Sequence, residues 1–302
     1  MQINLIPEKL RRHEIPGRVE IVNGHGNLPL VKIHTPWSAA EIYLLGAHVA
    51  GFQKNGEPPL IFMSAKSYFA AGKPIRGGVP ICFPWFGNRD GEPSHGFVRL
   101  AEWQLVKTAA APDGAVTVTL ALPQLPGRDA WKNLRTEFVV TVGETLTMEL
   151  IAANEACGEP LKIENCLHTY FQIGDIGAVT VNGLEPAVFD DFAFGAGGKR
   201  APAENAPLRI TQETNRVYPD NSAAVEIRDE KLKRTIRVEK FNSQSTVVWN
   251  PWTTQKMPDD FDQAEHRQMV CVESGNVKQN KLSLAPGKSS ALKVVLSSGP
   301  LK

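Results

Sequence analysis

The chain has 302 residues, a length that β-sandwiches and β-barrels commonly reach as one folding unit. Lys and Arg number 33 against 32 Asp and Glu, so the formal net charge is only +1. Such a balance excludes an overall field that would recruit nucleic acid or an anionic membrane surface. We therefore predict one β-sandwich catalytic domain spanning 1–302, with neither of those partners, in which an anionic ligand is bound locally.

The amino-terminal segment MQINLIPEKLRRHEIPG is charged and is interrupted by Pro7 and Pro16, so it lacks the continuous apolar stretch of a signal peptide. No apolar run elsewhere is long enough to cross a bilayer. The four cysteines lie in apolar contexts without zinc or redox spacing, and we expect all of them to be reduced core residues: Cys82, Cys157, Cys166 and Cys271. These features predict a cytoplasmic protein.

Short β-rich runs separated by Gly, Pro, Asn and Asp make up most of the chain. In chain order they include LVKIHTP (30–36), AEIYLLGAHVAGF (40–52), AVTVTLAL (115–122), TEFVVTVGETLTMELIAAN (136–154), AVEIRDEKLKRTIRVEKF (224–241), STVVWNPW (245–252), MVCVES (269–274) and SALKVVLSS (290–298). Gly143 and Glu144 separate two alternating runs, which predicts a hairpin with a two-residue loop. The pattern predicts an all-β fold of antiparallel strands, a sandwich or a barrel.

Three other segments depart from this strand pattern. The segments 65–72 and 262–268 have the composition for a turn or two of helix. The Gly, Ala and Pro content of 194–207 predicts a surface loop, because the spacing of a phosphate-binding loop is missing there.

His168 and Glu273 are the residues that best fit acid/base chemistry. Each lies in or directly after a β-rich apolar run, where a titratable group is costly to bury unless it has partners. An imidazole opposed to a carboxylate can move two protons near neutral pH without a cofactor or a metal. Two other interpretations remain open: His168 as an ordinary core histidine, and Glu273 as a solvated residue at a strand end.

The segment KPIRGGVPICFPWFGNRDGEPSHGFVR (73–99) combines arginines, glycines and a long apolar run. Arg76 and Arg99 are suited to binding phosphate oxygens, because a guanidinium donates in bidentate geometry. Alternatively, they pair with nearby acids such as Asp90, Glu92 or Glu102. Four aromatic residues are candidates for an apolar wall against a sugar ring, or for core positions: Trp85, Phe86, Phe97 and Trp252.

Five sequence blocks, in this order, resemble the glucose-6-phosphate 1-epimerase group of the aldose 1-epimerase superfamily. They are PIRGGVPICFPWFG (74–87), HGFVRLAEW (95–103), LHTYFQIGDI (167–176), VVWNPW (247–252) and VCVES (270–274). The resemblance extends over most of the chain. It implies a galactose mutarotase-like antiparallel β-supersandwich and an isomerase that needs neither cofactor nor metal.

The resemblance also implies roles for individual residues. His168 matches the general acid that protonates the sugar ring oxygen, and Glu273 matches the general base for the anomeric hydroxyl. Arg76 and Arg99 match phosphate or substrate contacts, and His95 matches a second histidine near the ring oxygen.

A sugar-binding aspartate of the family falls on Asp191, with Asp190 adjacent to it in the sequence. The sequence departs from many relatives at Ser94, where they have Gln before HGF, and at Val98 and Leu100, which flank Arg99. These departures leave the choice of sugar open.

We therefore expect an enzyme that interconverts the α and β anomers of a hexose 6-phosphate, with D-glucose 6-phosphate as the first candidate. The partner would be a small phosphosugar, and the protein a monomer or a weak homodimer. Two alternatives differ in class: a mutarotase of unphosphorylated aldoses, and a sugar-binding sandwich without catalytic activity. The first would not need the two arginines, and the second would not need His168 and Glu273 to face each other.

Overall fold

Antiparallel β-sheets dominate the structure, a computed structural model that describes residues 6–301. Residues 1–5 and 302 lie outside the described residues. The predicted 1–302 domain includes all six of them, and the amino-terminal segment includes residues 1–5. The all-β prediction is confirmed, because the described helices have at most six residues and the strands pair antiparallel throughout.

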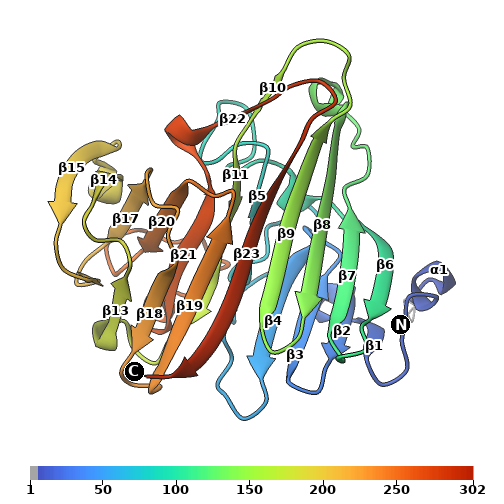
Figure 1. Cartoon of the computed structure of the whole chain (residues 1–302), viewed down its shortest axis with the longest axis horizontal. Helices are drawn as coiled ribbons and strands as arrows, with labels where there is room; N and C mark the ends of the chain where they lie inside the picture. Colours follow the sequence, from blue (N-terminus) through green and yellow to red (C-terminus); the bar gives the residue numbers. More distant parts are fainter. Residues whose placement is uncertain (1–5, 302) are drawn as a thin grey trace.

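The largest sheet has nine strands and crosses the whole molecule (Figure 1). Its order is β16 (Leu208–Arg209), β13 (Val179–Asn182), β18 (Val225–Asp229), β19 (Arg234–Phe241), β23 (Ser289–Pro300), β9 (Leu146–Asn154), β8 (Leu134–Val142), β7 (Val116–Ala121) and β6 (Gln104–Ala110). Alternate side chains of β8 and β9 are buried, as expected of a sheet with one face on a core. The predicted hairpin is present, but the two-residue loop was wrong: Val142 pairs with Leu146, so three residues connect the strands.

A second sheet has eight strands. Its path is β15 (Lys199–Glu204), β14 (Ala187–Asp191), β17 (Thr214–Tyr218), β20 (Ser245–Asn250), β21 (Met269–Asn276), β11 (Asn165–Leu167) and β5 (Ile81–Cys82), and β12 (Tyr170–Gln172) also pairs with β21. Val248 and Val272 on adjacent strands join the main hydrophobic core. Because side chains alternate along a strand, Trp249 and Glu273 project from the opposite face.

Two smaller sheets and several single-turn helices complete the fold. The sheets are β1 (Val19–Asn23), β2 (Pro29–His34), β3 (Ser38–Tyr43) with β4 (His48–Lys54), and β10 (Leu161–Ile163) with β22 (Leu282–Leu284). The helical turns are α1 (Glu8–Arg11), η1 (His25–Asn27), η2 (Val98–Leu100), η3 (Asp129–Trp131), η4 (Ile176–Ala178), η5 (Ala193–Gly195), η6 (Gln263–Gln268) and η7 (Lys278–Asn280).

One hydrophobic core joins the three large sheets. Val31 of β2, Phe138 of β8 and Val272 of β21 belong to the same buried cluster. The four-stranded sheet is also tied to the nine-stranded sheet by the hydroxyl of Ser38, which donates to the carbonyl oxygen of Gly143 at 2.6 Å. The opposite face of the eight-stranded sheet is covered as well, because every residue of β20 and β21 is buried and connecting segments place Phe62 and Phe261 against Trp249.

Of the two segments predicted to be helical, only one is. Residues 263–268 form η6, which begins with a capping box between Asp262 and Glu265. Residues 65–72 form turns and coil instead. Phe69 has a φ of 44°, which a right-handed helix does not allow, and the hydroxyl of Ser67 accepts from the backbone of Arg76.

Two further expectations were wrong in part. The 194–207 segment is largely exposed, as predicted for a surface loop, but its residues 199–204 form β15 at the edge of the eight-stranded sheet. Cys157 is exposed, whereas the other three cysteines are fully buried. Cys157 lies beside Gly158 and Glu159 in the turn after β9. The apolar residues before it in the sequence were therefore not a sign of a core position.

The chain from Phe83 to Gly96 closes a loop that holds His95. The backbone nitrogen of Phe83 donates to the carbonyl oxygen of His95 at 3.2 Å, and the nitrogen of His95 donates to Gly87 at 2.8 Å. Gly96 has a φ of 77°, and a Cβ atom there would lie 1.8 Å from the carbonyl oxygen of Phe83. Only glycine permits this closure.

Gly96→Ala should therefore destabilise the protein by about 3 kcal/mol or more, because backbone strain and a backbone clash coincide. Gly91→Ala is the matched control, since Gly91 has a φ of 71° with nothing within 4 Å of an added Cβ. We expect it to cost about 1 kcal/mol. Urea unfolding of both variants measures the difference, and equal losses would show that the Phe83 contact is not restrictive.

Candidate active site

A cavity of about 630 Å³ lies on the face of the eight-stranded sheet that is turned away from the main core. Its floor consists of two rows of register partners. Val217, Val247 and Glu273 form one row across β17, β20 and β21, and Asn215 and Trp249 belong to the next. The alternation that directs Val248 and Val272 into the core thus directs Glu273 into the cavity.

Connecting segments form the walls of this cavity. Five of the six site residues predicted from the sequence line it: Arg76, His95, Arg99, His168 and Glu273. His168 directly follows β11, whereas Arg99 lies in η2. Residues far apart in the sequence therefore meet here because β11 pairs with β21 beside the end of β5.

His168 and Glu273 are in direct contact. The Nε2 atom of His168 lies 3.2 Å from Oε1 of Glu273. Glu273 is 1% exposed and His168 8% exposed. Neither open alternative holds, since Glu273 is not a solvated strand end and His168 is not enclosed by the apolar core alone.

Burial acts on the two groups in opposite directions. It raises the pKa of Glu273 well above its usual range, and it lowers the pKa of His168 to about 3, with the positive charges of Arg99 and Arg76 contributing. Both directions disfavour an isolated charge at a buried position. The pair therefore holds one mobile proton at neutral pH, either as a neutral carboxyl and imidazole or as the ion pair.

His95 is also a neutral imidazole. The backbone nitrogen of Gly87 donates to its Nδ1 at 3.3 Å, which leaves the proton on Nε2. Burial lowers its pKa well below 6.5, and the charges of Arg99 and Lys278 add to this effect. Its ring centroid lies 5.7 Å from that of His168. The arrangement provides a neutral hydrogen-bond donor beside the acid/base pair.

Arg99 is anchored by its backbone surroundings. Its Nη2 donates to the carbonyl oxygen of Ser94 at 2.6 Å. Among the described residues, its buried Nε has no hydrogen-bond partner, and the same is true of Nδ1 of His168. A buried donor without a partner at the edge of a cavity is a group that a ligand can satisfy.

Arg76 is held by a buried carboxylate that the sequence analysis did not select. Its Nε lies 2.9 Å from Oδ2 of Asp260, which is 4% exposed. The alternative pairings with Asp90, Glu92 or Glu102 do not occur; Glu92 pairs with Arg128 instead. Asp260 fixes the guanidinium at the cavity.

Asp191 is not among the residues that line the cavity. Its carboxylate accepts from the backbone of Ala193 at 2.9 Å, and that of Asp190 pairs with Arg200. The polar lining residue from this part of the sheet is Asn215 on β17, one strand further along. The geometry thus gives no support to the predicted sugar contact of Asp191.

Several lining residues were not selected from the sequence, although Trp249 lies in the VVWNPW block. Lys256 and Lys278 bring the cationic side chains of the cavity to four, and Phe192 and Trp249 contribute aromatic rings. Of the predicted aromatic wall, only Phe86 lines this cavity. The other three do not: Trp85 and Phe97 are buried in the core, and Trp252 faces elsewhere.

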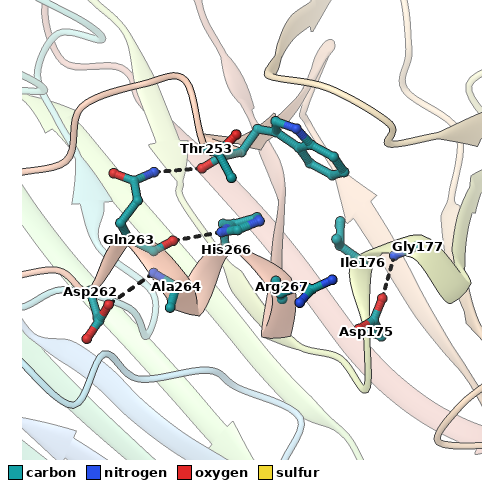
Figure 2. A pocket seen from close by; sticks show the side chains of 10 residues that line it. Asp175, Ile176, Gly177, Thr253, Asp262, Gln263, Ala264, His266 and Arg267 are labelled. Carbon is teal, nitrogen blue, oxygen red and sulfur yellow. Dashed lines mark hydrogen bonds between the residues drawn. The ribbon is translucent and has the colours of Figure 1, made fainter.

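A second cavity, of about 750 Å³, lies beside η4 and η6 (Figure 2). Asp175 and Asp262 accept there from backbone nitrogens, and Nδ1 of His266 contacts the carbonyl oxygen of Gln263 at 2.7 Å. These side chains stabilise the two helical turns, and Figure 2 shows them directed at their own backbone. None of the predicted site residues lines this cavity, so the smaller one is the better candidate.

A β-supersandwich with a buried carboxyl–imidazole pair in a polar, cationic cavity defines a sugar isomerase of the mutarotase class. The comparisons with known proteins agree. Residues 29–297 match the family model of aldose 1-epimerase. The chain belongs to the aldose 1-epimerase family.

Relatives of similar length support this assignment. A proposed glucose-6-phosphate 1-epimerase of Salmonella typhimurium is 34% identical over 82% of this chain and 83% of its own. One of Cenchrus ciliaris is 31% identical over 86% and 82%. The crystal structure of a proposed mutarotase from Salmonella typhimurium superimposes with a TM-score of 0.86 at 28% identity, covering 95% of this chain and 96% of that one. The predicted galactose mutarotase-like fold is confirmed.

Across residues 6–301, no helix has the length and apolar character needed to span a membrane.

His48 on β4 is also buried, and its pKa is affected by the same arginine as that of His168. Burial lowers its pKa to about 3, with Arg99 contributing. On unfolding below pH 6.5, His48 and His95 each take up a proton. In the His168–Glu273 pair, His168 gains a proton on unfolding and Glu273 loses one, so the pair adds little to the net proton uptake. Net uptake means that stability falls as the pH falls.

We therefore expect the free energy of unfolding to decrease as the pH falls below 6.5, with a slope that approaches about 2.7 kcal/mol per pH unit near pH 5.5, where the two unfolded histidines have taken up almost two protons. Urea titrations across this range measure it. His48→Gln should reduce the slope by one proton, whereas His34→Gln, at an exposed position, should leave it unchanged. A flat dependence in the unmodified protein would contradict the neutral state of these histidines.

Proposed function

We propose that this protein interconverts the α and β anomers of a hexose 6-phosphate, with D-glucose 6-phosphate as the substrate that the names of its relatives favour. The observation that carries the proposal is the contact between His168 and Glu273 in a cavity with four cationic side chains. The contact supplies the proton transfers, and the cations supply a site for the phosphate.

Opening of the sugar ring requires that one proton is removed from the C1 hydroxyl and that another is donated to the ring oxygen. Glu273 takes the proton of the C1 hydroxyl, and His168 gives a proton to the ring oxygen, so that the C1–ring oxygen bond breaks and an aldehyde forms. Rotation about C1–C2 presents the other carbonyl face. The same groups then act in reverse, and the ring closes as the opposite anomer.

The close contact of the two catalytic groups suits this chemistry. Both reacting oxygens are bonded to C1, so the acid and the base must act a short distance apart. The reactive form has an ionised Glu273 and a protonated His168, and it contains the same single proton as the neutral pair. Transfer of that proton between Oε1 and Nε2 prepares the site without exchange with solvent.

Other lining groups would orient the sugar. His95 offers an N–H donor near His168, and the amide of Asn215 offers both a donor and an acceptor to sugar hydroxyls. The ring of Trp249 lies 6.0 Å from that of His168 and can border the apolar face of the sugar. Holding the reacting atoms in place supports the rate as much as the proton transfers do.

The phosphate group would bind to the cationic side chains. A phosphate accepts charge-assisted hydrogen bonds from guanidinium groups, and Arg76 and Arg99 are both in the cavity. Lys278 packs against Phe86 and Phe192, with Nζ at 5.9 and 5.1 Å from the ring centroids, and adds a third charge. A mutarotase of free aldoses or a passive sugar-binding protein would not need this combination.

Glu273→Gln and His168→Ala should each lower kcat for glucose 6-phosphate mutarotation by about 10²- to 10⁴-fold, because each removes one proton transfer. Polarimetry or NMR of anomer equilibration, corrected for the spontaneous reaction, measures the loss. His34→Ala should retain full activity. Undiminished rates in either catalytic variant would exclude the assignment, and binding without any mutarotation in the native protein would favour the passive sugar-binding alternative.

Arg76→Ala and Lys278→Ala should lower kcat/KM for glucose 6-phosphate by about 10- to 100-fold, the loss expected for one charge-assisted hydrogen bond. The effect on free glucose should be much smaller, because it has no phosphate to hold. Lys281→Ala, which removes an exposed lysine, is the control. Equal losses on both sugars would argue against a phosphate site and for an enzyme of unphosphorylated aldoses.

A further inference from the structure

The two oxygens of the Glu273 carboxyl group have different partners. Oε1 faces Nε2 of His168 at 3.2 Å, whereas Oε2 lies 3.5 Å from Sγ of Cys166. Cys166 and Glu273 are both buried. The geometry is that of a thiol donating to a carboxylate oxygen, on the side of the carboxyl group that is turned away from the imidazole.

The backbone is arranged so that the thiol can reach this oxygen. Cys166 on β11 is the register partner of Gly275 on β21, two residues after Glu273 and on the same face. A Cβ atom on Gly275 would lie 2.8 Å from Cα and Cβ of Cys166 and 2.2 Å from the carbonyl oxygen of Asn165. The glycine thus leaves room for Cys166 directly beside the carboxyl group.

We propose that Cys166 is a positioning residue for the general base: its thiol holds Oε2 of Glu273, so that Oε1 is presented to His168 and the substrate. The role given to Glu273 rests on the proposed function, but the contact itself does not. A thiol is a weak donor, whereas a hydroxyl or backbone N–H at the same place would stabilise the carboxylate more strongly. A cysteine therefore fixes the orientation of the base while preserving its strength.

The balance of forces on Glu273 agrees with this role. Burial raises the pKa of Glu273, and the hydrogen bond from Cys166 and the charge of Arg99 lower it. Lys240 on β19 lies near Cys166 from the other sheet, and its pKa is lowered to about 7 by burial. The titratable groups facing Glu273 or Cys166 are His168, Tyr170 of β12, Cys82 of β5, Cys271 of β21, Arg99 of η2 and Lys240.

Two substitutions of Cys166 should shift the titration of the pair in opposite directions. The last proton of the pair resides mainly on Glu273, so the high-pH limb of kcat/KM reports its pKa. Cys166→Ser supplies a stronger donor and should move this limb to lower pH by about one unit. Cys166→Ala removes the donor and should move it to higher pH and lower kcat, because the carboxyl group is less well oriented.

Infrared difference spectroscopy provides a readout that needs no substrate. The carbonyl band of the protonated Glu273 carboxyl, identified by its loss in Glu273→Gln, should disappear at a lower pH in Cys166→Ser than in the native protein. Cys82→Ser, at a neighbouring buried thiol for which the structure gives no hydrogen bond to Glu273, should leave the band and the pH profile unshifted.

The outcomes separate the two hypotheses. Loss of activity in Cys166→Ser and Cys166→Ala with unshifted limbs and an unshifted band would overturn the positioning role and indicate packing alone. If Cys166→Ala does not fold, the band of Cys166→Ser decides. A shifted band in a protein without mutarotase activity would support the Cys166 contact and refute the proposed function.

Discussion

Contact between a carboxyl group and an imidazole that are both buried is the interaction on which the site depends. Glu273 and His168 cannot both be charged independently there, because burial opposes each charge, so they share one proton. This condition constrains the fold around them. β11 and β21 must pair so that residues 168 and 273 meet, and the apolar sides of both strands must supply the core that excludes water.

Much of this could be predicted from the sequence because its causes are local. The alternation in MVCVES assigns Val270 and Val272 to one face and Glu273 to the other, and a carboxylate inside such a run needs a partner. The strand-rich pattern likewise gives the sheet class, since period-two burial survives in β8 and β9. His168 follows from the same argument, supported by the family resemblance.

The other site residues could not be predicted, because their positions depend on which strands and loops come together. Local composition does not determine these contacts. Asp191 and Asn215 lie on neighbouring strands, but only Asn215 is on the lining, and nothing in the letters around either one distinguishes them. Asp260, in a polar stretch of a long connection, is buried against Arg76 only because that connection folds over the cavity. The segment 65–72 was predicted to be helical from its composition. Phe69 in this segment has a positive φ, which the surrounding chain imposes and a helix does not allow.

On the proposed function, the position of the arginines would link substrate binding to the proton that His168 and Glu273 share. Arg99 and Arg76 both lower the pKa of His168, so in the free site they disfavour the protonated imidazole that ring opening requires. A phosphate dianion bound to these guanidinium groups would offset their field. Its arrival would then favour the ionised Glu273 and protonated His168 over the neutral pair. On the proposed function, a phosphorylated sugar would not only be held by the arginines but would also bring the acid and the base into their reactive charge states.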